Sequence, residues 1–179
     1  MRIVVDTSVA RAAGESEDRT AQACFNSLEA ILAKPSYLAA FNQSLLREWF
    51  KEIEDRRGRK RRYASSSASE WFLKMRRRLV VLPERADFIN QCIQASASLA
   101  AASAIQKDLH LVDLALQADH RVLSTDEKIV GHLRRLGARV PEVCPILWVH
   151  PVDHDAPDWL VGGASARTAR PKLITFAFI

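Results

Sequence analysis

Short apolar runs alternate with longer amphipathic segments along the chain. The run 2–6 is β-branched and unbroken up to its final carboxylate, which is typical of a buried strand in the centre of a parallel sheet. Further strands are predicted at 37–40, 79–82, 121–124 and 145–149. Apolar residues recurring at intervals of three and four predict helices at 18–34, 41–53, 70–78, 86–105, 108–118 and 127–136. This alternation predicts an α/β layer fold with a mostly parallel sheet.

The pattern changes beyond His150, where proline and glycine repeatedly interrupt the chain. We therefore predict one domain over residues 1–149, with a basic insertion near 51–78, and a C-terminal extension over 150–179. Within the extension, 158–161 has the character of a helical turn.

Composition indicates an ordinary globular chain. The 179 residues are 48% hydrophobic and 26% charged, which excludes a disordered protein, a collagen-like repeat and a disulfide-stapled miniprotein. Cys24, Cys92 and Cys144 are odd in number and widely separated, so we expect small buried hydrophobes in a reducing compartment. The first apolar run stops at Asp6, and no stretch approaches the ~18 apolar residues of a membrane span. We therefore expect a cytoplasmic protein that does not associate with a membrane.

Positive charge is concentrated in one window. Eleven basic and four acidic side chains lie between Lys51 and Arg78, a local charge of +7 in a chain of net +5. Such a field favours a polyanion, of which nucleic acid is the commonest, although a solvated basic loop without a partner has the same composition. The candidate RNA-binding residues are Arg56, Arg57, Arg59, Lys60, Arg61, Arg62, Arg76, Arg77 and Arg78.

Carboxylates stand where predicted strands end and predicted helices begin. Asp6 and Asp126 follow strands, Asp108 opens a helix, and Glu48 lies in the helix after the second strand. Because strand ends and the following helix starts gather at one edge of a parallel sheet, these side chains are expected to lie close together. Clustered carboxylates raise one another's pKa unless a cation joins them. Mg²⁺ or Mn²⁺, which prefer oxygen ligands, fits this need.

Other interpretations of these acids remain open. Helix capping alone explains carboxylates at such positions, and Ser124 with Glu127 has the spacing of a capping box. Glu52 lies nearer than Glu48 to the centre of their helix's apolar stripe, so either can be the helix acid of the site. Asp113 lies about 140° round the helix from Asp108 and is expected to face elsewhere.

The histidines divide into two groups. His150 and His154, together with Asp153, form a second, weaker candidate metal set in the extension. The remaining three are isolated and are expected at the surface or in packing: His110, His120 and His132.

Four short motifs occur in an order that resembles the PIN-domain family, which includes the VapC-type toxin ribonucleases. The first is Val4-Val-Asp-Thr-Ser-Val9, a strand ending in aspartate, and the second is Ser44-Leu-Leu-Arg-Glu48. The third, Lys107-Asp-Leu-His-Leu-Val-Asp-Leu-Ala-Leu116, has an aspartate opening a helix. The fourth, Val122-Leu-Ser-Thr-Asp126, is a strand followed by a hydroxyl residue and an aspartate.

The resemblance covers residues 1 to about 149 and implies a three-layer α/β/α sandwich and a ribonuclease that depends on Mg²⁺ or Mn²⁺. It implies RNA as the substrate and, for toxin members, an antitoxin protein as partner and a homodimer. Thr7 and Ser124 would support the site. The implied catalytic and metal-binding acids are Asp6, Glu48, Asp108 and Asp126. The basic insertion and the extension depart from the compact toxins.

Two other functions compete with this hypothesis. A catalytically inactive PIN-like protein would bind RNA or act as a scaffold while keeping the fold. A phosphatase-like hydrolase would use Asp6 as a covalent nucleophile. Such enzymes commonly carry a second aspartate two residues later, where this chain has Ser8.

Overall fold

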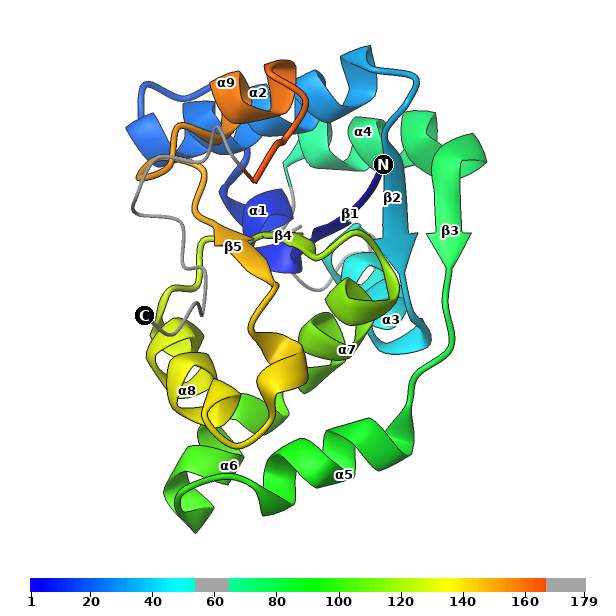
Figure 1. Cartoon of the computed structure of the whole chain (residues 1–179). Helices are drawn as coiled ribbons and strands as arrows, with labels where there is room; N and C mark the ends of the chain where they lie inside the picture. Colours follow the sequence, from blue (N-terminus) through cyan, green and yellow to red (C-terminus); the bar gives the residue numbers. More distant parts are fainter. Residues whose placement is uncertain (54–64, 167–179) are drawn as a thin grey trace.

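The computed structural model describes residues 1–53 and 65–166. Five strands form one sheet in the order β3-β2-β1-β4-β5, and each neighbouring pair is parallel. Helices cover both faces of this sheet (Figure 1), which confirms the predicted three-layer α/β/α sandwich. The strands are β1 (Arg2–Val5), β2 (Leu38–Phe41), β3 (Leu79–Val81), β4 (Arg121–Leu123) and β5 (Leu147–Val149).

The helices form two layers, one on each face of the sheet (Figure 1). One layer consists of α2 (Arg19–Ala33), α4 (Ser66–Met75) and α9 (Ala156–Val161). The opposite layer consists of α5 (Ala86–Gln94), α6 (Leu99–Gln106), α7 (Leu109–Gln117) and α8 (Lys128–Gly137). Two further helices follow β1 and β2: α1 (Thr7–Ala12) and α3 (Gln43–Ile53). Two 3-10 turns precede β3 and β5: η1 (Arg76–Arg78) and η2 (Pro141–Val143).

The first strand occupies the centre of the sheet, as its unbroken apolar run predicts. Ile3, Val4 and Val5 are fully buried, since helices cover both faces of β1. Trp49 of α3 donates its indole N–H to the carbonyl of Val5 at 2.9 Å, which fixes α3 against the carboxyl end of β1. Trp49 therefore fixes α3 at the end of β1 that Asp6 follows.

The predicted helix over 86–105 is wrong as a single helix. It is broken between α5 and α6, where Ser96 donates its hydroxyl to the carbonyl of Cys92 and Ser98 accepts from the N–H of Ala101. Ser98 therefore starts a new helix. The alanine-rich pattern continues through the break, so periodicity alone does not reveal it.

The second half of the basic window belongs to the folded core. In α4, Trp71 and Phe72 are buried, and each packs its ring against Trp49 at centroid distances of 5.3 and 5.5 Å. Phe50 lies on the outer side of α3 and is 45% exposed, with its ring centroid 5.6 Å from that of Phe72.

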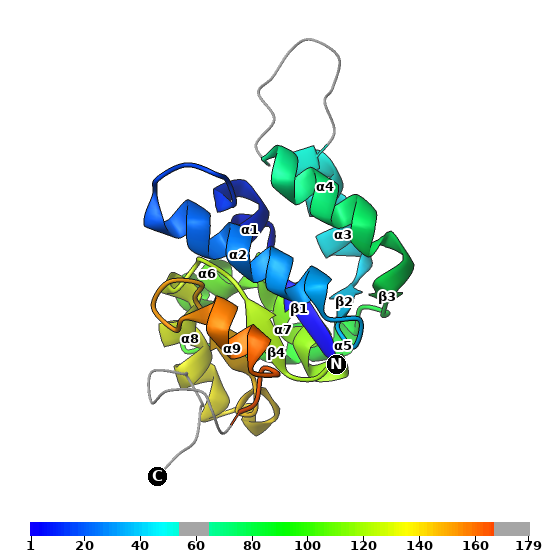
Figure 2. The ribbon, with the colours of Figure 1, turned by 90° about the horizontal axis from the view of Figure 1, so that it is seen from above.

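The described part of the C-terminal extension packs onto the first helical layer. Figure 2 shows α9 alongside α2, and Leu160 is fully buried. Tyr37 donates its hydroxyl to the carbonyl of Leu160 at 2.5 Å, and Arg121 donates to the carbonyl of Ala164 at 2.7 Å. These contacts join residues 156–164 to both halves of the sheet.

Candidate functional site

The candidate site lies where the direction of strand addition reverses. From β1 the sheet continues to β2 and β3 on one side and to β4 and β5 on the other. Ligand sites of open parallel sheets form beyond the carboxyl ends of the strands at such a point. Asp6 follows β1 and donates its backbone N–H to the carbonyl of Leu123 at 3.0 Å, so the loops after β1 and β4 begin side by side.

A pocket of about 220 Å³ opens at this edge. All four acids predicted for the site lie on its wall, although they come from distant parts of the sequence. Three cationic side chains share the pocket with them. Its lining is Asp6, Thr7, Ser8, Arg11, Glu48, Lys51, Glu52, Lys107, Asp108 and Asp126.

Asp6 is held by three hydroxyl groups. Ser8 and Ser124 donate to its Oδ2 at 2.6 and 2.7 Å, and Thr7 donates to its Oδ1 at 3.3 Å. Asp6 stands at the cap position of α1, yet its side chain makes no capping bond within the described part of the chain. Capping therefore does not account for this carboxylate, whereas a role in the pocket does.

Ser124 connects the two strands of the site. Its hydroxyl donates to Asp6 and accepts the N–H of Asp126 at 3.0 Å. Consequently Ser124 does not form the capping box that its spacing to Glu127 allows. Glu127 occupies the N-cap position of α8, but its side chain makes no capping hydrogen bond among the residues described. The capping role belongs in part to Asp126, whose Oδ1 accepts from the N–H of Lys128 at 2.9 Å.

An ammonium group lies between two of the acids. Nζ of Lys107 is 3.5 Å from Oδ2 of Asp108 and 3.4 Å from Oδ2 of Asp126. Burial raises the pKa of Asp108 to about 6; Lys107 opposes this shift, and the negative charges of Asp6 and Asp126 add to it. Asp108 in turn raises the pKa of Lys107. The pocket lining thus carries five carboxylates against three cationic side chains.

Both candidate glutamates of α3 reach the pocket. Oε1 of Glu48 lies 3.5 Å from Nε2 of His110, and Oε1 of Glu52 lies 3.8 Å from Nε of Arg11. Burial opposes protonation of His110, but Glu48, the backbone of Lys107 and the charge of Asp108 together outweigh it, so the pKa of His110 is raised. The geometry does not select one glutamate over the other as the acid of the site.

The donor set fits a hard divalent cation. Oδ2 of Asp108 and Oε2 of Glu52 are buried and accept no hydrogen bond from any described residue. A buried carboxylate oxygen without such a partner is costly. Oxygen donors from several carboxylates are the ligands that Mg²⁺ and Mn²⁺ prefer. An ion in the pocket would satisfy these oxygens.

Comparison with known families and proteins does not identify the chain. No family model matches it. A search of curated proteins finds no match either. The pocket's own residues must therefore carry the functional argument.

The basic residues predicted to bind RNA divide into three groups. Arg76 and Arg77 of η1 are exposed to solvent. Arg78 donates to the carbonyls of Leu32 and Lys34, both at 2.8 Å, and so caps the end of α2. The remaining candidates lie outside the described residues: Arg56, Arg57, Arg59, Lys60, Arg61 and Arg62.

No helix of the described chain is long and apolar enough to cross a membrane.

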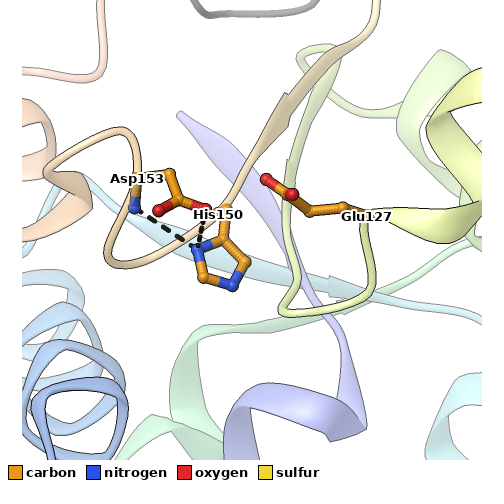
Figure 3. Close-up of side chains that lie close together, drawn as sticks. All are labelled: Glu127, His150 and Asp153. Atoms are coloured by element: carbon orange, nitrogen blue, oxygen red, sulfur yellow. Dashed lines mark hydrogen bonds and ion pairs between the residues drawn. The ribbon is translucent and has the colours of Figure 1, made fainter.

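A second group of metal-capable side chains lies in the segments that follow β4 and β5 (Figure 3). Ligand atoms of Glu127, His150 and Asp153 lie within 4.8 Å of one another. Glu127 takes the place expected for His154, whose Nδ1 accepts the N–H of His150 at 2.7 Å. Glu127 and Asp153 are exposed, and Nδ1 of His150 lies 3.1 Å from the Asp153 carboxylate and accepts the backbone N–H of Asp153 at 3.3 Å, so local contacts within this turn account for the position of the histidine.

Asp113 lies away from the pocket, as its helical position predicts. It is fully buried, and its carboxylate accepts from the backbone and side chain of Arg85 at 3.0 and 2.6 Å and from Gln117 at 3.1 Å. Asp113 therefore ties α7 to the start of α5. It is a structural acid.

Five residues in or next to the site were not predicted for it: Ser8, Arg11, Lys51, Lys107 and His110. Ser8 has a sequence signal, since it is a hydroxyl residue two positions beyond the strand-ending Asp6. Lys107 precedes Asp108, but its second contact, with Asp126, depends on how the loops meet. His110 was expected in ordinary packing, whereas it contacts a pocket glutamate.

Proposed function

We propose that the chain is a divalent-metal-dependent endoribonuclease in which Asp6, Asp108 and Asp126, with a glutamate of α3, hold Mg²⁺ or Mn²⁺. The observation that carries the proposal is the convergence of these carboxylates on one pocket. Like charges gathered in this way destabilise a fold unless a cation joins them. Oδ2 of Asp108 supports the same conclusion, because it is buried, accepts no hydrogen bond within the described chain, and has the Lys107 ammonium no nearer than 3.5 Å.

The pocket residues have separate tasks in this proposal. A divalent ion held by these carboxylates would supply the positive charge that hydrolysis of a phosphodiester needs. Ser8 and Ser124 hold Asp6 in one orientation, so little reorganisation is needed when the ion arrives. Arg11 and Lys51 line the same pocket and offer cations to the phosphates on either side of the cleaved bond.

RNA is the substrate that the charge distribution favours. The window from Lys51 to Arg78 carries +7, and its described members Arg76 and Arg77 are exposed. Contacts of this kind bind the phosphate backbone regardless of sequence. The proposals of an antitoxin partner and of a homodimer rest on the motif resemblance alone.

The test uses the full chain and a fluorescently labelled single-stranded RNA. We expect cleavage with Mn²⁺ or Mg²⁺, no cleavage with EDTA, and a loss of at least 10²-fold in Asp6→Asn. Asp153→Asn, which changes an exposed acid of the second group in Figure 3, is the matched control and should cleave like the parent. Equal cleavage by Asp6→Asn and the parent would refute the proposal.

The same preparation separates the competing functions. An inactive PIN-like binding protein would retain RNA with steep salt dependence and show no turnover with any divalent ion. A phosphatase-like hydrolase would release phosphate from a small phosphomonoester through covalent modification of Asp6. Either result would replace the ribonuclease proposal.

A further inference from the structure

His110 occupies a fixed position between two helices of the site. It lies in the first turn of α7, two residues after Asp108, and is 8% exposed. Its carbonyl accepts from the side-chain amide of Asn42 at 2.9 Å, and the other end of that amide accepts the N–H of Leu45 at 2.9 Å. Asn42 thus joins the start of α3 to the start of α7, so the backbone of His110 is held relative to α3.

The ring of His110 faces an acid of the pocket. Its Nε2 lies 3.5 Å from Oε1 of Glu48 and has no hydrogen-bond partner among the described residues. The ring is buried, whereas the Glu48 side chain is 37% exposed. Because burial restricts the ring more than it restricts the half-exposed carboxylate, His110 is the more restrained partner of this pair.

We propose that His110 is a positioning residue for the candidate metal centre: its Nε2, unpartnered within the described chain and 3.5 Å from Oε1 of Glu48, donates to that oxygen when a cation is bound and thereby presents Oε2 to the cation. This inference rests on the proposed function, because it requires a divalent ion in the pocket. It deepens that proposal by giving Glu48 a defined orientation. Glu52 contacts Arg11 instead and is independent of His110.

The partners of metal ligands make a recognisable contribution to affinity. Substitution of a residue that orients a ligand costs roughly 10- to 100-fold in metal affinity. The loss appears only while the oriented ligand is present. The effect of changing His110 should therefore vanish when Glu48 is already removed, whereas a general loss of packing would persist.

The experiment measures Mn²⁺ affinity of the full chain by calorimetry, with no RNA present. We expect His110→Phe to bind Mn²⁺ roughly 10- to 100-fold more weakly than the parent. His110→Gln keeps an N–H donor and should recover most of this loss. In Glu48→Gln, adding His110→Phe should cause no further loss, whereas in the matched background Glu52→Gln it should cause its full effect.

Two results are kept distinct by including Asp6→Asn. If Asp6→Asn weakens Mn²⁺ binding but His110→Phe does not, the role of His110 is refuted and the metal centre stands. If Asp6→Asn also binds like the parent, the proposed function itself fails. Should His110→Phe not fold, imidazole ¹⁵N spectra of the parent give the answer: addition of Mg²⁺ should shift Nε2 of His110, and no shift would overturn the inference.

Discussion

Ser124 donates its hydroxyl to Oδ2 of Asp6 at 2.7 Å, although the two residues are 118 positions apart in the sequence. This bond joins the loops after two adjacent parallel strands. Because the same hydroxyl accepts the N–H of Asp126, one oxygen atom organises two of the proposed metal ligands. The arrangement leads to the first of several predictions.

Ser124→Ala should weaken Mn²⁺ binding about 10-fold, because it frees Asp6 and leaves the N–H of Asp126 without its acceptor. Ser27→Ala is the matched control, since Ser27 is equally buried but bonds only within α2, to the carbonyl of Ala23. Calorimetric titration of both variants measures the difference. Similar affinities in the two would contradict an organising role for Ser124.

Lys107→Met should tighten Mn²⁺ binding several-fold, because the lysine ammonium neutralises part of the charge of Asp108 and Asp126 that a metal ion would use. Without metal, the variant should melt at a lower temperature than the parent. Lys74→Met, which removes an exposed pair with Glu70 away from the pocket, should change neither quantity. Weaker Mn²⁺ binding in Lys107→Met would indicate instead that the lysine orders the two acids.

The metal-free chain should lose stability as the pH rises through about 6. The pKa of Asp108 is raised from 3.8 to about 6, so the folded state binds a proton more tightly than the unfolded state. The stabilisation is complete below pH 3.8 and is lost above about 6. Asp108→Asn should therefore be more stable than the parent at pH 7.5, by on the order of 2 kcal/mol. Chemical denaturation in EDTA across this pH range tests the sign.

Asp113→Asn should have the opposite effect on stability. The carboxylate of Asp113 is fully buried and accepts three hydrogen bonds, so its loss should destabilise the fold by about 2 kcal/mol at pH 7.5. Mn²⁺ affinity should be unchanged. Asp108 stands at the N-cap of α7, and Asp113 lies five residues further along the same helix. Comparing the two substitutions therefore distinguishes an acid of the proposed site from a structural acid. Destabilisation by both substitutions would remove that distinction.

The exposed arginines should act on RNA affinity rather than on chemistry. Changing Arg76 and Arg77 to alanine should weaken binding to every RNA sequence and reduce the slope of log affinity against log salt by about 1.4, roughly 0.7 for each phosphate contact on a single strand. The matched control changes Arg134 and Arg135, an adjacent basic pair in the last turn of α8. An equal effect of both pairs would show that only net charge matters.

The strands and the main acids could be predicted because they depend on local pattern and on one general rule. An unbroken β-branched run gives the central strand, and parallel strands bring their carboxyl ends to one edge, which predicts that Asp6 and Asp126 converge. By contrast, the contact between His110 and Glu48 depends on the crossing of α3 and α7. No spacing within either helix encodes it.

Local pattern also misses features that depend on single hydrogen bonds. The sequence around Ser124 is compatible with two roles for its hydroxyl, capping of α8 and donation to Asp6, and the pattern alone does not distinguish them. The break between α5 and α6 is set by Ser98 within a continuous alanine-rich pattern. The packing of α9 requires a surface on α2 that forms only in the complete fold.

The pairing of β1 with β4 has a consequence for biosynthesis. The neighbour of Val5 is Leu123, so the first strand leaves the ribosome long before the strand that completes this edge of the sheet. A nascent chain that has not yet reached residue 124 holds Asp6 without Ser124, and therefore without the hydrogen bond that orients its carboxylate. For the proposed nuclease, this order of assembly would delay activity until the segment around residue 124 has been made and folded.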